Sequence, residues 1–422
     1  MKTSPLERFP DIARWLASAP APRSVEMLPG PNPTLRIDGV QLASRFDPCG
    51  EATQQARLVP EGSPRATLYG FAQGEIVRVL LSRPELKELR VVVLNPGVAR
   101  TSLARCGADW LADPRIELRR TDARSEVEAP FTASPADLVL ASDEAARLRD
   151  LVQLELATPF LRQRQARQEN ELRKRVAANE ARFRDDPDAS ILFGSRSGAV
   201  LCVAAAGPSL ARHYGELRGR AGDLVAVDAA LKPLLEAGVV PAYVVTQDPD
   251  VAGMRRVFDV PSSALGATTL VYFPVVAPEV LAGWKGPRRV ARGPSPLYDG
   301  FRGGRVAELF SSGSVLHPSV DLARRLGARR IELFGADFSM PGGASHVAGA
   351  AWARRRSGSA ASWVLDGHGR RVPSQPNLVG YLRDLERWLE RQALPAGIEI
   401  VQRSAEGAAI RGARLEEVAR AG

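Results

Sequence analysis

Residues 199–210, AVLCVAAAGPSL, carry the pattern that decides the fold. The first five residues are apolar and predict a short buried strand, and the small residues that follow predict a tight turn into a helix. Proline suits the first turn of a helix because it lacks an amide proton, and serine caps exposed backbone amides. A helix start of this kind also binds phosphate or carboxylate. Gly207, Pro208 and Ser209 are therefore predicted either to bind a phosphate or carboxylate or to cap the helix.

The strand and helix pattern continues downstream of this turn. Strands are predicted at 223–227, 242–246 and 330–334, and each is followed closely by an aspartate: Asp228, Asp248 and Asp337. Ligands of an open parallel sheet lie beyond the carboxyl ends of its strands. We therefore expect the three aspartates to meet the 207–209 turn in one crevice, although each aspartate alone also suits an ordinary turn.

Two further features are expected at the same edge of the sheet. A run of small polar residues precedes a predicted helix at 315–326, namely Ser311, Ser312, Gly313 and Ser314. A second helix start suits a nucleotide that carries a second charged group. His346 follows Asp337 across a Met-Pro-Gly-Gly-Ala-Ser loop, and it is predicted to be a proton carrier or phosphate donor, or else a loop histidine with a structural partner.

The rest of the chain predicts a second, smaller unit of the same class. Residues 66–94 read as strand, glycine turn, helix and strand, but only Gly70 and Gly74 are present and no acidic residue follows the second strand to hold a ribose. We expect a supporting unit rather than a cofactor site. The predicted fold is α/β: a central Rossmann-like parallel-sheet domain, preceded by a smaller degenerate Rossmann-like domain, with a helical linker and a C-terminal helix. The predicted parts are an adaptor segment (1–65), the small supporting domain (66–136), the helical linker (137–188), a catalytic domain (189–375) and a C-terminal helical extension (376–422).

Composition excludes several classes of protein. The 422 residues carry a net charge of +9, but the excess is almost all arginine and only 6% of the residues are aromatic, so we expect no nucleic-acid partner. The only three adjacent arginines are at 354–356. No segment approaches the roughly 18 apolar residues of a membrane span, and the start of the chain lacks an apolar signal region. Three scattered cysteines disfavour a disulfide scaffold, and the predicted location is the cytoplasm.

The sequence also lacks the short motifs of several enzyme classes. No His-Glu-x-x-His, Gly-x-Ser-x-Gly or Walker sequence is present, which disfavours zinc proteases, serine hydrolases and P-loop enzymes. No cofactor is required by the pattern. If a metal takes part, the hard oxygen ligands Asp248 and Asp250 suit magnesium, although their spacing does not demand it.

Longer stretches of the chain resemble the motility accessory factor family, bacterial proteins associated with flagellin glycosylation and motility. These stretches are 203–210, 228–231, 238–249, 335–338 with the later His346, and 404–412, where alanine replaces the second glycine of the family's Glu-Gly-Gly-Ala motif. The resemblance implies a glycosyltransferase that moves a nonulosonic acid from its CMP conjugate to serine or threonine of flagellin. The central domain is also similar to bacterial sialyltransferases and to archaeal hydroxymethyl-dihydropterin pyrophosphokinases, which transfer diphosphate from ATP.

The resemblance places the predicted residues in roles. It implies nucleotide contact for the 207–209 turn, and it puts Asp228, Asp248, Asp337 and His346 around the reacting centre. The acceptor hydroxyl is expected to attack as CMP leaves, with His346 or Asp248 ranked above Asp337 as the base. Three functions remain open: a nucleotide-sugar glycosyltransferase, an ATP-dependent pyrophosphokinase and a non-catalytic flagellar adaptor.

Overall fold

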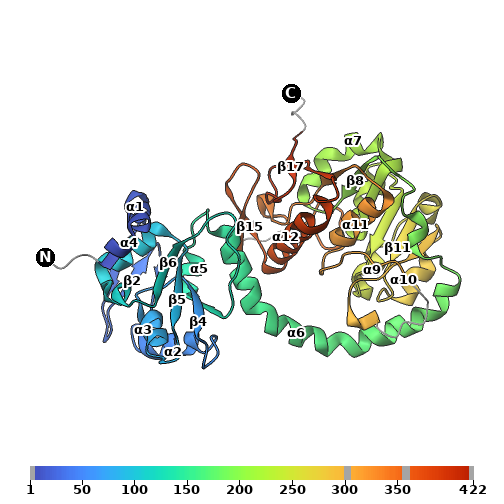
Figure 1. Ribbon diagram of the computed structural model, residues 1–422. Coiled ribbons are helices and arrows are strands. Elements are labelled where there is room, and N and C mark those ends of the chain that lie inside the picture. The colour runs from blue at the N-terminus through green and yellow to red at the C-terminus, as the bar shows by residue number, and fades with distance from the viewer. Residues whose placement is uncertain (1–4, 299–305, 354–361, 418–422) are drawn as a thin grey trace. The chain divides into compact units, whose positions relative to one another are not determined.

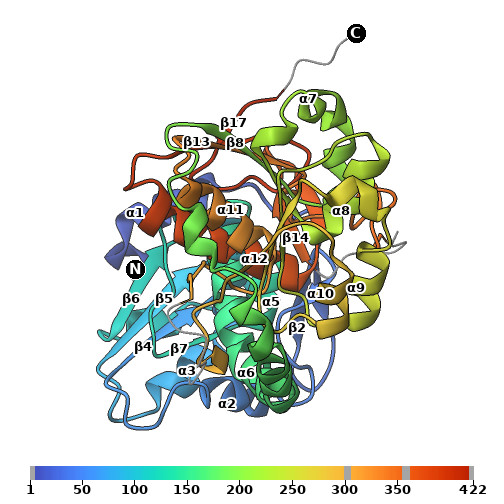
Figure 2. The ribbon, with the colours of Figure 1, turned by 90° about the vertical axis from the view of Figure 1, so that its right-hand side faces the viewer.

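The computed structural model describes residues 5–298, 306–353 and 362–417. The chain divides into two compact units, residues 1–158 and 159–422, which we call unit 1 and unit 2 (Figures 1 and 2). Each unit is built on a parallel β-sheet with helices packed against it. The predicted α/β class with two parallel-sheet domains is therefore confirmed, whereas the predicted five-part division stays a prediction.

Unit 1 contains a four-stranded parallel sheet in the order β6-β5-β4-β7. Its strands are β4 (Arg65–Tyr69), β5 (Glu88–Val93), β6 (Ile116–Arg120) and β7 (Phe131–Ala133). The helices are α1 (Pro10–Ser18), α2 (Pro48–Ala56), α3 (Glu75–Leu81), α4 (Pro96–Cys106) and α5 (Pro135–Val139). A small antiparallel sheet is formed by β1 (Val25–Leu28), β2 (Thr34–Ile37) and β3 (Val40–Gln41).

The glycine turn between β4 and α3 is filled by the protein itself. Gly70 has a φ of +74°, and a Cβ atom there would lie 2.1 Å from Cβ of Asp137. The Asp137 carboxylate accepts a hydrogen bond from the Ala72 amide at 2.8 Å. An internal carboxylate thus takes a position where a dinucleotide-binding turn holds a phosphate. This geometry supports the predicted structural role of the turn.

A single 34-residue helix, α6 (Ala146–Asn179), begins in unit 1 and ends in unit 2. Unit 2 follows with an eight-stranded parallel sheet in the order β12-β11-β10-β9-β8-β13-β16-β17. The strands are β8 (Val200–Ala204), β9 (Leu224–Val227), β10 (Tyr243–Thr246), β11 (Thr269–Tyr272), β12 (Arg288–Val290), β13 (Arg330–Phe334), β16 (Glu399–Gln402) and β17 (Arg414–Leu415). The central strands are buried apolar runs, as expected of a sheet covered on both faces.

The helices of unit 2 are short apart from two. They are α7 (Tyr214–Arg218), α8 (Asp228–Glu236), α9 (Val251–Val257), α10 (Pro278–Gly283), α11 (Leu316–Leu326) and α12 (Pro376–Trp388), and α12 follows a hairpin of β14 (Ser362–Leu365) and β15 (Arg371–Ser374). Helix α11 packs against β8, β9, β10 and β13, and α9 contacts both α8 and α10 (Figure 2). Among the described residues, no helix has the length and apolarity needed to cross a bilayer.

One local expectation needs correction. The helix expected directly after Gly207 begins as a 3-10 helix, Pro208–His213, and only Tyr214–Arg218 is α-helical. Ser209 does not cap backbone amides there, because its own amide and hydroxyl bond the carboxylate of Asp337.

The strand order locates the site. From β8 the chain proceeds through β9, β10, β11 and β12 on one side, whereas β13, β16 and β17 extend the sheet on the other. The direction of strand addition therefore reverses between β8 and β13. Ligands of open α/β sheets bind in the crevice at such a reversal, beyond the carboxyl ends of the strands.

Candidate functional site

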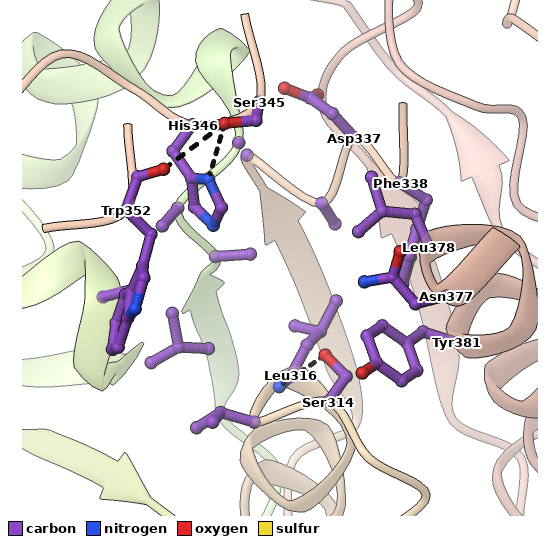
Figure 3. A pocket seen from close by; sticks show the side chains of 18 of the residues that line it. Ser314, Leu316, Asp337, Phe338, Ser345, His346, Trp352, Asn377, Leu378 and Tyr381 are labelled. Atoms are coloured by element: carbon purple, nitrogen blue, oxygen red, sulfur yellow. Dashed lines mark hydrogen bonds between the residues drawn. The ribbon is translucent and has the colours of Figure 1, made fainter. Parts of the chain in front are cut away.

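A cleft of about 660 Å³ opens beyond the carboxyl ends of β8, β9, β10 and β13 (Figure 3). Its floor is formed by the turns that follow these strands, and it is lined by Gly207, Asp228, Asp248, Gly335 and Asp337. The predicted convergence of the three aspartates on the 207–209 turn is therefore what the structure shows. His346, Gly313 and Ser314 line the same cleft.

The remaining predicted nucleotide contacts are not among the residues that line the cleft. Gly207 lines the cleft but Pro208 and Ser209 do not, and the Ser209 side chain is buried against Asp337. The hydroxyls of Ser311 and Ser312 donate to Gln247 and Asp384, respectively. These side chains hold the surrounding loops together, and their predicted nucleotide contacts stay predictions.

Asp337 fixes the turn after β8. One carboxylate oxygen accepts from the Ser209 hydroxyl at 2.5 Å and the other from the Ser209 amide at 2.8 Å. A Cβ atom on Gly207 would lie 2.3 Å from the Gly335 carbonyl oxygen, so only glycine fits between the two turns. Burial raises the pKa of Asp337, and the Ser209 hydrogen bonds oppose that shift. The Ser209 amide, predicted to meet a ligand anion, is thus occupied by an internal carboxylate.

The backbone next to Asp337 is strained and held in place. Phe338 lines the cleft with a φ of +46°, a conformation that costs a non-glycine residue about 1 to 3 kcal/mol. The Ser374 hydroxyl donates to the Phe338 carbonyl at 2.7 Å, and the Ala408 amide donates to the Asp337 carbonyl at 2.7 Å. Residues 404–412, which the family resemblance singled out, therefore pack against the backbone of Asp337. A Cβ atom on Gly407 would lie 2.6 Å from the Cα atom of Asp337.

Asp228 and Asp248 form a pair of interacting carboxyl groups. Burial, followed by the charge of Asp248, raises the pKa of Asp228 to about 7. The Thr246 hydroxyl and the Ala229 amide donate to Asp228 at 2.8 and 2.7 Å. Burial also raises the pKa of Asp248. The Asp228 carboxyl group therefore gains and loses its proton near neutral pH, which is the property expected of an acid or base group.

His346 lies on the side of the cleft formed by the loop after β13. The loop is anchored because the Val347 amide donates to the Ala206 carbonyl at 2.8 Å. Nδ1 of His346 lies 3.1 Å from the Ser345 hydroxyl, which itself donates to the Trp352 carbonyl, so the Ser345 oxygen is placed to accept a hydrogen bond from Nδ1–H. The other ring nitrogen, Nε2, points into the cleft (Figure 3). Burial lowers the pKa of His346, which keeps the ring neutral and able to accept a proton at pH 7.

Residues of α12 and of the loop before α11 form the opposite side of the cleft. Asn377, Leu378 and Tyr381 face His346 and Trp352 across it, with Ser314 and Leu316 beside Tyr381 (Figure 3). Gly313 has a φ of +83°, and a Cβ atom there would lie 2.7 Å from the Tyr381 ring. None of the described residues that this side contributes to the cleft is charged.

His317 connects the two parts of that uncharged side, and the sequence did not single it out. Its Nδ1 accepts from the Ser312 amide at 3.2 Å, and Nε2 lies 2.9 Å from the Tyr381 carbonyl. Complete burial lowers the pKa of His317 to about 4. A histidine three residues after Ser314 at a predicted helix start was the available signal, but nothing in the sequence indicated its partner on α12.

The described residues contain no group of three or more His, Cys, Asp or Glu side chains arranged to hold a metal ion. The predicted magnesium ligands have local partners: Asp248 accepts from the Asp250 amide at 2.7 Å, and Asp250 accepts from the Ala252 amide at 3.2 Å. These two carboxylates shape the turn into α9. The three adjacent arginines at 354–356 lie outside the described residues.

Comparison with known proteins agrees with the predicted resemblance of the central domain. Residues 174–343 match the family model described as 6-hydroxymethylpterin diphosphokinase MptE-like. The matched segment contains the 207–209 turn and all three cleft aspartates and ends before His346 and α12. No curated protein matches the chain.

The chain also matches solved structures, two of which are a glycosyltransferase and a synthase. A MAf glycosyltransferase from Magnetospirillum magneticum AMB-1 is 16% identical, with 97% of this chain and 73% of that chain covered and a TM-score of 0.46. Spermidine synthase from Thermotoga maritima is 12% identical, with 30% of this chain and 46% of that chain covered and a TM-score of 0.23.

Proposed function

We propose that this chain is a cytoplasmic glycosyltransferase that moves a nonulosonic acid from a CMP-activated donor to serine or threonine hydroxyls of flagellin. The observation that supports it most is the meeting of His346 with the Asp228–Asp248 pair in one cleft at the reversal point of a parallel sheet. Its volume, about 660 Å³, lies within the range of roughly 300 to 1,000 Å³ that small-molecule sites occupy.

The reaction is a direct transfer. The acceptor oxygen forms a bond to the anomeric carbon of the sugar, and the bond from that carbon to the phosphate oxygen breaks. The electron pair leaves with the phosphate of CMP, and the hydroxyl proton moves to a base in the cleft. No redox partner enters this balance.

His346 is the base that the geometry favours. Its ring is neutral at pH 7, is oriented through Nδ1 by Ser345, and presents Nε2 to the cleft. Asp248 is the alternative base, since its pKa is raised by burial. Asp337 has both oxygens engaged by Ser209, so we assign it a positioning role rather than proton transfer.

A second candidate is an ATP-dependent diphosphokinase, because residues 174–343 match a family model of that description. The charge of the cleft favours the first candidate. ATP brings three phosphates, whereas the described residues that line the cleft include three aspartates and no lysine or arginine. The nearby Arg212 is paired with Glu406. A CMP-activated nonulosonic acid carries one phosphate and one carboxylate, which is less negative charge than the triphosphate of ATP, so it needs less compensating charge in this environment. A non-catalytic adaptor would not require such a cleft.

The two activities are separated by one assay. Purified chain is incubated with CMP-activated nonulosonic acid and flagellin, and in parallel with ATP, magnesium and hydroxymethyl-dihydropterin; products are measured by mass spectrometry. We expect a mass increase of one sugar per modified flagellin hydroxyl, abolished in His346→Ala. Diphosphorylated pterin with unmodified flagellin would replace the first candidate by the second, and no product in either reaction would contradict both.

A further inference from the structure

The two long sides of the cleft differ in chemistry. One side presents His346 and Trp352 (Figure 3). The floor of the cleft carries three aspartates, of which Asp337 lies next to Phe338 (Figure 3). The other side presents the amide of Asn377, the phenol of Tyr381 and the hydroxyl of Ser314, with Leu316 and Leu378 between them (Figure 3). The second side therefore offers uncharged hydrogen-bonding groups on an apolar surface, and we call it the α12 side.

The negative charge of Asp337 disfavours binding of the donor phosphate at the Gly-Pro-Ser turn, residues 207–209. The Asp337 carboxylate already occupies the Ser209 amide and hydroxyl. A phosphate bound at that turn would lie against this carboxylate, and like charges at contact distance repel strongly in a partly buried site. The described lining residues of the α12 side present no carboxylate to a phosphate.

The geometry of direct transfer also places the donor phosphate on the α12 side. In a direct displacement, the attacking oxygen and the leaving oxygen lie on opposite sides of the reacting carbon. The base must lie beside the attacking hydroxyl, and Nε2 of His346 points into the cleft from one side. The leaving phosphate then lies on the facing side, where Ser314, Asn377 and Tyr381 are found.

The groups on the α12 side are fixed before a ligand arrives. His317 bridges the Ser312 amide and the Tyr381 carbonyl at 3.2 and 2.9 Å, and Gly313 leaves no space between its own Cα and the Tyr381 ring. Ser312 also donates to Asp384 of α12 at 2.5 Å. The loop before α11 and the helix α12 are thereby joined, so Tyr381 and Ser314 keep a fixed separation. Binding groups that are already ordered lose less entropy when a ligand binds.

We infer that Asn377 and Tyr381 are donor-binding residues that hold the phosphate and nucleoside of the leaving nucleotide against the α12 side of the cleft. The inference rests on the proposed function and adds the place and orientation of the donor. Both residues lie outside the matched segment 174–343.

The test is nucleotide affinity, measured by isothermal titration calorimetry with CMP, CDP and ATP as probes. Tyr381→Phe removes one hydroxyl and Asn377→Ala removes one amide, and we expect each to weaken CMP binding about tenfold, because a hydrogen bond to a charged group is lost. Tyr243→Phe is a matched control, since Tyr243 is half-buried at the start of β10, at the opposite end of the strand from the cleft. Asn170→Ala, on the exposed surface of α6, is the control for the amide.

The outcomes are distinct. Weakened CMP binding in the two α12 variants with unchanged controls supports the inference, and donor KM should rise in parallel while turnover at saturation changes little. If wild-type protein binds CMP and both variants bind it equally well, the inference is overturned and the proposed function stands. If wild-type protein binds none of the three nucleotides, the proposed function and the inference fail together.

Discussion

The carboxylate of Asp337 receives both the backbone amide and the side-chain hydroxyl of Ser209, 128 residues earlier in the chain. This contact joins the turns after β8 and β13 at the point where the strand order reverses. Unit 1 contains a similar contact, in which Asp137, after β7, accepts a hydrogen bond from the Ala72 amide in the turn after β4. In both units the strand order reverses next to the first strand of the sheet, β4 or β8. The aspartate that follows the neighbouring strand, β7 or β13, accepts a hydrogen bond from the turn after that first strand.

We expect Ser209→Ala to lower the free energy of unfolding by about 1 to 3 kcal/mol, because a buried carboxylate loses a hydrogen-bond donor. Asp337→Asn should retain more stability and activity than Asp337→Ala, since an amide can accept from the Ser209 amide and donate to its hydroxyl. Denaturant titration and turnover measure the two effects, with the exposed Ser263→Ala as control. A normally folded Asp337→Asn protein without any turnover would show that Asp337 takes part in proton transfer.

Replacing His346 with glutamine should lower kcat by about 100- to 10,000-fold, the usual contribution of a general base, with a small change in donor KM. Burial lowers the pKa of His346, so wild-type activity should be constant above the ordinary histidine value of 6.5 and fall at more acidic pH as the ring becomes protonated. The pH dependence of kcat checks this. An acidic limb that persists unchanged in His346→Gln would assign the titration to another group, with Asp248 the first candidate.

His317 should make the protein sensitive to acid. Its pKa is lowered from 6.5 to about 4 in the folded state, so the unfolded chain binds the proton more tightly. Stability is therefore complete above pH 6.5 and falls as the pH decreases toward 4, by up to about 3 kcal/mol. Protonation also places a second proton between Nδ1 and the Ser312 amide. Urea titrations from pH 4 to 7 should show a smaller decrease in His317→Gln; equal slopes in the two proteins would contradict the assignment.

Asp228 should have the opposite dependence. Its folded-state pKa of about 7 lies above the ordinary 3.8, so the ionised form is disfavoured in the folded protein, and stability decreases as the pH rises from 4 through 7. Asp228→Asn cannot ionise. We expect it to unfold with a free energy higher by about 4 kcal/mol at pH 8 and little changed at pH 4, and to lose activity. A variant that is less stable than wild type at pH 8 would show that the carboxylate is needed for folding.

The sequence predicted β8, β9, β10 and β13 because these strands are short apolar runs followed closely by glycine or aspartate, whereas β12, β16 and β17 were not predicted. The 330–334 strand was predicted with its observed bounds, and the meeting of Asp228, Asp248 and Asp337 follows from the rule that strand ends share an edge. The occupation of the Ser209 amide by Asp337 was not predictable, because helix-start patterns do not reveal which anion fills them. The α12 side was missed for a related reason: the sequence predicted a helical extension at 376–422, but Asn377 and Tyr381 carry no motif that marks a binding site.

The most direct test of the whole account is a thermal-shift measurement of the wild-type protein with CMP and, separately, with ATP and magnesium. A ligand that binds only the folded state at 100 times its Kd stabilises it by about 2.7 kcal/mol, so CMP should raise the Tm by several degrees. At the same CMP concentration, Tyr381→Phe with a tenfold higher Kd should gain only about 1.4 kcal/mol, so its increase in Tm should be about half that of wild type. Tyr243→Phe should keep the full increase. No change in Tm with either nucleotide at millimolar concentration would contradict a nucleotide site in the cleft beyond the carboxyl ends of β8, β9, β10 and β13.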